Sequence, residues 1–250
     1  MKSIANKKTG FIGKSIIALI SAVTLCIGAV STPALAADAT ASVNVASAYV
    51  WRGQTFNDGA VVQPSVDVTS ENGFGFNAWG NYDLSDYNNT VDSREFSEID
   101  FTVSYGFSLE KLDIGVGVIS YLFPAGAADT AEVYLSLGME IIGGLSAAIT
   151  GYYDFDALEE FSYSTFALSY GYDINDKLSA ELGATIAYAG DKFVQAAGGV
   201  DSGFFDYTLS LSMDYAISEA WGLSAGVTYI DTADDDNLKE KSVGGMLDTN

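Results

Sequence analysis

The chain has 250 residues, 48% of them hydrophobic and 13% aromatic, with no histidine, one cysteine and a formal net charge of −22. This charge excludes nucleic-acid binding through phosphates, and the aromatic content excludes a disordered chain. The lack of histidine excludes Ser-His-Asp catalysis and histidine-containing zinc sites. We therefore expect no catalytic residue, no metal site and no cofactor, and we expect cations as the favoured partners.

The first 36 residues have the pattern of an export signal. A leader with four lysines precedes the apolar run "SIIALISAVTLCIGAV", and "ALA" at 34–36 supplies the small residues of a cleavage site. We expect cleavage after Ala36, which makes residues 1–36 a signal peptide and residues 37–250 the mature domain. The mature chain would carry seven cationic and 33 acidic residues, a net charge of −26, and no cysteine.

Alternation with a period of two replaces helical periodicity along the rest of the chain. In "EIDFTVSYGF" the apolar residues from Ile99 to Phe107 share one face, and polar residues or glycine take the other. Twelve such stretches are expected as strands, near 43–52, 61–69, 73–83, 96–107, 112–122, 131–140, 145–155, 162–172, 178–188, 204–215, 221–231 and 240–248.

The connections between these strands alternate between short turns and long polar loops. Strands of about 9–11 residues with short turns at one end and long loops at the other are typical of outer-membrane barrels. Aromatic residues also gather in two bands near the strand ends, as expected at the two membrane interfaces. The sequence therefore predicts an all-β, antiparallel transmembrane barrel of about twelve strands in a bacterial outer membrane. A secreted sandwich or soluble barrel is the alternative.

Two stretches depart from regular alternation. Phe161 and Tyr163 have one parity and Phe166, Leu168 and Tyr170 the other, so we expect a β-bulge near 164–165 or a later strand start.

Pro64 is the second irregularity. Proline cannot donate to a fully paired ladder, so a bulge or an unpaired rim position is expected there.

The opening strands resemble a known bacterial family. The sequence "SAYVWRG" at 47–53 is similar to the "S-x-Y-V-[FW]-R-G" start of the TorF-type porins, and "VQPSVDV" and "FNAWG" resemble their second and third strands. The resemblance implies an outer-membrane barrel with a pore and offers no catalytic residue to transfer. Members of that family end in an aromatic-rich strand, whereas "KSVGGMLDTN" here has no terminal aromatic residue.

The parity of the strands assigns a polar, acidic lining to the lumen. Many other inward positions are Gly, Ala or Ser, and carboxylates in such a space attract cations. Twelve strands are compatible with either a narrow pore or a plugged lumen. The candidate pore-lining residues are Arg52, Asp67, Asn77, Asn81, Glu98, Asp100, Asp113, Glu132, Glu140, Asp154, Glu181, Asp206 and Asp214.

Arg52 follows an aromatic pair, and few cationic residues occur in the mature chain. The alternation places Tyr49 and Trp51 toward lipid, so Arg52 is expected to point inward beside Gln63 and Asp67. A structural ion pair that orders the first hairpin is the favoured interpretation, and a constriction residue that tunes ion passage is the alternative.

Two other motifs are weaker. The acidic run 231–237 could coordinate calcium but lacks the glycine and final glutamate of an EF-hand, so a solvated loop is favoured. Trp79 is expected to point inward and pack in the lumen, with sugar stacking as the alternative.

The leading functional hypothesis is a passive channel for small solutes, preferably small cations, in contact with outer-membrane lipid. The alternative is a closed structural or adhesive barrel that acts through its acidic outer loops. The sequence does not predict an oligomeric state.

Overall fold

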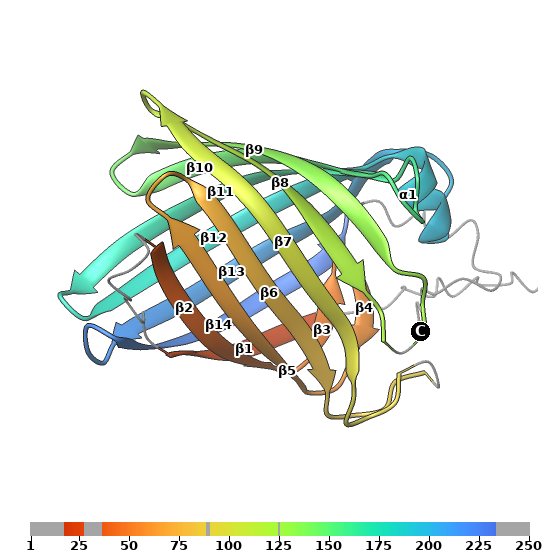
Figure 1. Ribbon diagram of the computed structural model, residues 1–250, viewed down its shortest axis with the longest axis horizontal. Coiled ribbons are helices and arrows are strands. Elements are labelled where there is room, and N and C mark those ends of the chain that lie inside the picture. The colour runs from red at the N-terminus through yellow and green to blue at the C-terminus, as the bar shows by residue number, and fades with distance from the viewer. Residues whose placement is uncertain (1–17, 28–36, 89–90, 125, 234–250) are drawn as a thin grey trace, which may run out of the picture.

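The computed structural model describes residues 18–27, 37–88, 91–124 and 126–233, and these residues form one antiparallel β-barrel (Figure 1). Its twelve wall strands follow the order β1-β14-β13-β12-β11-β10-β9-β8-β7-β6-β5-β2. The predicted all-β antiparallel barrel is therefore confirmed.

Consecutive strands along the chain are neighbours in the wall from β5 to β14. Short turns join them at one end and longer loops at the other, so the barrel has a turn side and a loop side (Figure 1). These strands are β5 (Val61–Ser70), β6 (Phe74–Asp83), β7 (Phe96–Leu109), β8 (Leu112–Leu122), β9 (Thr130–Ile142), β10 (Leu145–Asp154), β11 (Ser162–Asn175), β12 (Leu178–Ala189), β13 (Gly203–Ala216) and β14 (Trp221–Thr232).

The barrel closes through β1 (Ala18–Ile27), which pairs with β14 on one side and with β2 (Ala37–Ala46) on the other. Without β1 the remaining eleven wall strands would form a sheet that is open between β14 and β2. β1 comes from the apolar run expected to be the core of the export signal. The expected closing strand at 240–248 lies outside the described residues.

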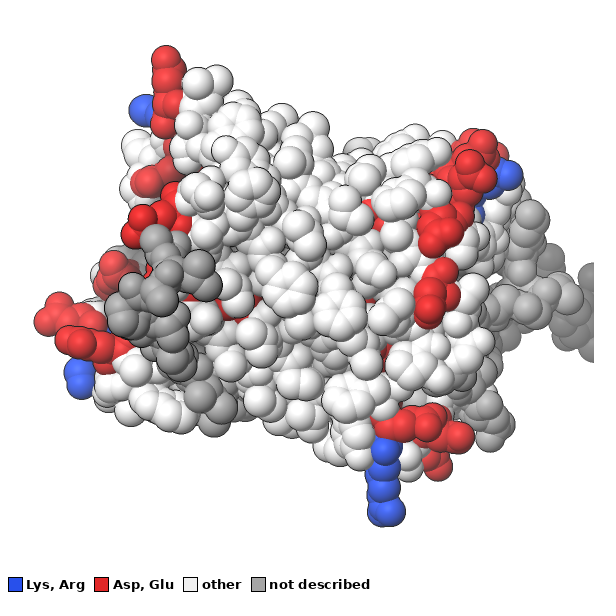
Figure 2. Space-filling view, in the orientation of Figure 1, with Lys and Arg blue, Asp and Glu red and all other residues white. Residues whose placement is uncertain are grey.

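The outer face of the wall is apolar, as alternation requires. Large side chains on it are exposed, including Leu135 at 49%, Leu182 at 56% and Leu209 at 51%. Figure 2 shows this face as a broad, largely uncharged band, with most Asp and Glu gathered toward the two ends. Within the described part of the chain, no helix has the length and apolar character needed to cross a membrane.

The predicted bounds of the first strand, 43–52, are wrong. β2 leaves the wall at Ala46, and the next residues form a separate two-stranded hairpin of β3 (Tyr49–Trp51) and β4 (Gln54–Asn57). Arg52 and Gly53 have φ values of 49° and 75°, and positive φ at both central residues is the pattern of a type I′ turn.

The side chains of this hairpin also contradict the expected orientation. Tyr49 is 8% exposed and packs with the inward-facing Trp79 instead of facing lipid. Trp51 packs with Tyr121 of β8. Inward placement is favoured because these rings and the Tyr49 hydroxyl find packing and hydrogen-bond partners inside the barrel.

The expected bulge near 164–165 is absent from β11, and so is the later strand start. The pairing of β11 with β10 and with β12 runs without a shift through Ser164 and Thr165. Tyr163 has the opposite parity simply because it points inward, where it is 5% exposed.

Two other strands show local irregularities. The pairing of β13 with β12 shifts between Ile186 and Tyr188. Phe205 has the same sequence parity as the outward-facing Leu209 but is 3% exposed in an interior cluster. Pro64 is neither a bulge nor an unpaired rim residue, because it lies inside β5 and pairs in register with Val43 of β2. The interruption is on the other side, where the ladder between β5 and β6 skips Gln63 and Pro64.

Candidate functional site

The β3–β4 hairpin crosses the lumen on the loop side. Its base joins β2 and β5, whereas its tip meets β9 and β11, which lie about half-way around the ring. At the tip, a Cβ added to Gly53 would lie 2.8 Å from the Cβ of Asp206 on β13. We call this hairpin, together with helix α1 (Asp191–Ala196), the plug.

Arg52 fastens the tip of the hairpin to the wall. Its two terminal nitrogens each donate a 2.7 Å hydrogen bond to Glu132, and the two side chains are 8% and 3% exposed. Tyr121 donates a further 2.9 Å bond to the same carboxylate. Burial acts to lower the pKa of Arg52, but hydrogen bonding and attraction to Glu132 outweigh it, so the pKa lies above its ordinary value.

Aromatic rings surround the Arg52 guanidinium. Its central carbon lies 4.3 Å from the ring centroid of Trp51, 4.7 Å from Tyr152, 4.6 Å from Tyr163 and 5.9 Å from Phe193. A desolvated cation over such faces gains about 2 kcal/mol or more from the ring quadrupoles. We call these four rings and Glu132 the guanidinium cage.

Two further contacts hold the base of the hairpin. Tyr49 donates a 2.7 Å hydrogen bond to Glu98 on β7, and Asn57 donates a 2.6 Å bond to Asp83 on β6. Burial, followed by the nearby carboxylate of Glu98, raises the pKa of Tyr49 well above its ordinary value. Tyr49 therefore remains a neutral donor to Glu98.

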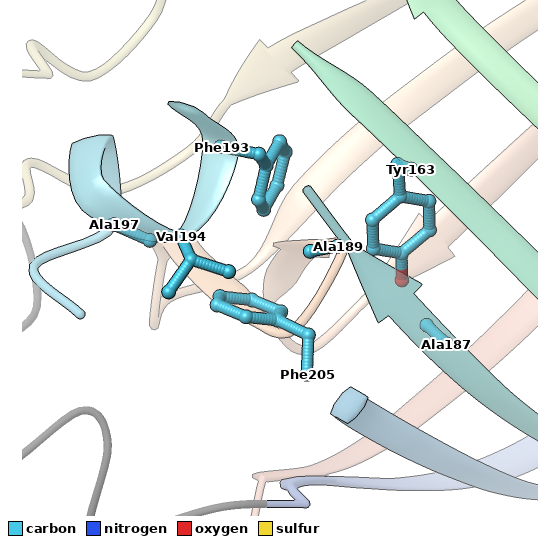
Figure 3. Close-up of a cluster of buried hydrophobic side chains, with 7 residues drawn as sticks. All are labelled: Tyr163, Ala187, Ala189, Phe193, Val194, Ala197 and Phe205. Atoms are coloured by element: carbon cyan, nitrogen blue, oxygen red, sulfur yellow. The ribbon is translucent and has the colours of Figure 1, made fainter. Parts of the chain in front are cut away.

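Helix α1 supplies the second half of the plug from the loop between β12 and β13. Figure 3 shows Phe193, Val194 and Ala197 facing Phe205, Tyr163 and two alanines of β12, and all seven are buried. The two halves meet where Phe193 packs against Trp51, with ring centroids 6.1 Å apart. Water is thus excluded from the centre of the plug.

The turn side of the lumen is lined differently. Small residues such as Gly115, Gly183 and Ser210 occupy inward positions, and the acidic side chains there are exposed. Asn77 donates a 2.7 Å bond to Asp67, and Ser108 donates a 2.6 Å bond to Asp113. Carboxylates on this side therefore remain in contact with water.

The structure divides the candidate pore-lining residues between these two halves. One group is buried or half-buried and lies in the plug or at its level. It consists of Arg52, Asn81, Glu98, Asp100, Glu132, Asp154 and Asp206. Those that are exposed or half-buried on the turn side are Asp67, Asn77, Asp113, Glu140, Glu181 and Asp214. The expected ion pair of Arg52 is present, but its partner is Glu132 and not a neighbour on β5.

Sequence reasoning missed the aromatic side of the plug. Alternation alone predicts that Tyr49 and Trp51 face lipid and that Tyr163 precedes a bulge. Phe193 falls in the long loop between the strands predicted at 178–188 and 204–215. The available signal was Arg52-Gly53, a two-residue turn with glycine at its second position between the short stretches "YVW" and "QTFN".

The structure tests the prediction for Trp79 and describes only part of the acidic run 231–237. The packing role of Trp79 is confirmed by its contact with Tyr49 at 5.7 Å between ring centroids. Most of the acidic run 231–237 lies outside the described residues, and Asp231 accepts a 2.7 Å bond from Tyr229. Among the described residues, no three His, Cys, Asp or Glu side chains are grouped to hold a metal ion.

The chain belongs to the family described as "Bacterial protein of unknown function (Gcw_chp)", whose sequence profile matches residues 31–248. No curated protein matches the sequence. The barrel is similar in chain path to the NanC porin, with 11% identity, a TM-score of 0.46, and coverage of 86% of this chain and 98% of that one.

Two other solved structures match this chain with comparable sequence identity and coverage and with lower TM-scores. An outer membrane channel from Pseudomonas putida F1 has 10% identity and a TM-score of 0.37, covering 91% of this chain and 100% of its own. The outer membrane channel DcaP of Acinetobacter baumannii has 8% identity and a TM-score of 0.33, covering 85% and 95%.

Proposed function

We propose that the protein is a porin-like channel of a bacterial outer membrane that passes small cations and is restricted by the plug. The resemblance of residues 47–53 to the TorF-type porins supports this proposal. The observation that carries it is the turn-side lumen, where Gly and Ser occupy inward positions and the carboxylates are exposed.

The outer surface supports placement in a membrane. Apolar side chains along the wall are exposed at fractions that would cost considerable free energy in water, because each Å² of apolar area left in water costs about 25 cal/mol. Exposed aromatics lie at both ends of this band, with Tyr153 at 45% and Phe155 at 48% on the loop side, and Tyr215 at 45% and Trp221 at 46% on the turn side. Such girdles are typical of both interfaces of an outer membrane.

The acidic lumen supports a cation preference. Asp67, Asp113 and Asp214 are exposed on the turn side, whereas the cation of Arg52 is neutralised by Glu132. The test uses a hairpin-shortened variant, in which residues 49–57 are replaced by a short Gly-Ser linker. Its reversal potential is measured across a planar bilayer under a potassium chloride gradient. Cation selectivity is expected, and anion selectivity would contradict the proposal.

We also propose that residues 1–36 are removed on export, which leaves β2 and β14 with unpaired edges. Unpaired backbone groups in lipid cost several kcal/mol each. The closing strand expected at 240–248 lies outside the described residues. Mass spectrometry of the membrane-extracted protein should give a chain that begins at Ala37, and a retained leader would contradict the cleavage.

The plug itself favours a second candidate, a closed barrel that acts through its acidic outer loops. The two candidates separate in the wild-type protein reconstituted into liposomes. A channel admits small cations, whereas a closed surface barrel admits none and changes its function when the acidic loops at 83–95, 189–203 and 231–240 are exchanged.

A further inference from the structure

The guanidinium cage has the chemistry of a ligand site, although a side chain of the same protein occupies it. A planar cation is held edge-on by both oxygens of one carboxylate and face-on by aromatic rings. This combination is selective, because a compact ammonium cannot form two parallel hydrogen bonds and stack at the same time.

The wall supplies a part of the cage that does not depend on the hairpin. Glu132 lies on β9, Tyr152 on β10 and Tyr163 on β11, whereas Trp51 belongs to the hairpin and Phe193 to α1. If the hairpin moves away, the carboxylate and two of the aromatic faces remain.

Neighbouring groups fix these wall residues in the geometry that binds a planar cation. Tyr121 donates a 2.9 Å hydrogen bond to Glu132, and Tyr163 donates a 2.6 Å bond to Asp206. With the hairpin in place Glu132 is 3% exposed, so removing the Arg52 side chain alone leaves a buried carboxylate that pays a large desolvation cost. The vacated pocket therefore favours binding of another cation of the same shape.

We propose that the guanidinium cage is a binding site for planar guanidinium-type cations, that Arg52 occupies it in the closed barrel, and that solutes of this class replace Arg52 at the plug. The last part rests on the proposed channel function. The binding part depends only on the cage.

The binding test is chemical rescue of Arg52→Ala. Thermal unfolding in detergent is measured with guanidinium chloride at about 20 mM, and with sodium chloride and methylammonium chloride at the same concentration. With guanidinium at about ten times its dissociation constant, we expect the melting temperature to rise by about 3 °C, and we expect no comparable rise with the other two salts. If Arg52→Ala folds poorly, the folded fraction after dilution from urea into each salt is measured instead.

The matched control is the double variant Arg52→Ala/Glu132→Gln, which retains the aromatic faces but removes the carboxylate. Guanidinium should have no specific effect on it. An equal response to methylammonium, or an equal response of the double variant, would overturn the proposed site.

The transport part is tested by solute uptake into liposomes that contain the wild-type protein. Arginine should enter at least about twofold faster than lysine, and equal rates would overturn the assignment of the solute class. Conductance of the hairpin-shortened variant in potassium chloride does not involve guanidinium. It therefore separates failure of this inference from failure of the proposed channel.

Discussion

The loop-side and turn-side halves of the lumen are built from the same alternating strands, yet they differ in contact with water. On the loop side Glu98, Glu132 and Asp206 are 3–4% exposed, and a tyrosine or arginine contacts each of them. On the turn side Asp67 and Asp113 are exposed. The difference comes from two loops, β3–β4 and α1, which fold into one end of the barrel. The strands make a polar tube, and the loops determine where it is closed.

The largest expected effect on this difference comes from Arg52→Ala. Removing one partner of a buried ion pair leaves Glu132 uncompensated, so we expect the free energy of unfolding to fall by about 3–5 kcal/mol, measured by denaturant unfolding in detergent. Lys192→Ala is the matched control, because the Lys192–Glu160 pair at 3.7 Å is more than half exposed. Its expected effect is below about 0.5 kcal/mol, and similar effects of the two substitutions would argue against a buried anchor.

Gly53→Ala tests how tightly the tip of the hairpin fits the opposite wall. Gly53 has φ +75°, and the added Cβ would lie 2.8 Å from Asp206, so strain and overlap together should cost about 3 kcal/mol. Gly143→Ala is the control, since Gly143 has φ +50° and no atom within 4 Å of the added Cβ. It should cost about 1 kcal/mol, and melting temperatures of the two variants give the comparison.

Tyr49→Phe removes one hydrogen bond at the base of the plug and keeps the ring. Glu98 then loses its donor inside a buried region, so we expect a loss of about 2 kcal/mol in unfolding experiments. Tyr153→Phe, at a 45% exposed tyrosine of the outer face, should change stability by less than about 0.5 kcal/mol. An equally small change for Tyr49→Phe would show that the hydroxyl does not anchor the hairpin.

Asp67→Asn should have the smallest effect on stability because its carboxylate is exposed on the turn side. We expect less than about 0.5 kcal/mol from thermal unfolding. In the hairpin-shortened variant the same substitution should reduce cation selectivity, because it removes one negative charge from the lumen. An unchanged reversal potential would place Asp67 outside the ion path.

Period-two alternation was sufficient to predict the wall. It gave the positions of β5 to β14 to within a few residues, because a strand with lipid on one side and water on the other must alternate. It also predicted the inward position of Trp79, which packs with Tyr49.

The plug was not predictable from the same pattern, for a physical reason. Aromatic residues are favoured both at a membrane interface and in a packed interior, so Tyr49, Trp51 and Tyr163 fit either environment by composition. Their direction depends on contacts between distant segments, such as Tyr49 with Glu98, 49 residues away, and Arg52 with Glu132, 80 residues away. An alternating pattern contains no information about such pairs.

The most direct test of the central claim is the ionic current through the wild-type protein and through the hairpin-shortened variant in the same planar bilayer system. The loop at 86–93 is shortened in a control variant, because it lies at the same end of the barrel and outside the plug as defined above. We predict small currents for the wild type and for the control, and larger unitary currents for the hairpin-shortened variant. Equal currents through all three proteins would contradict the claim that the β3–β4 hairpin closes the lumen.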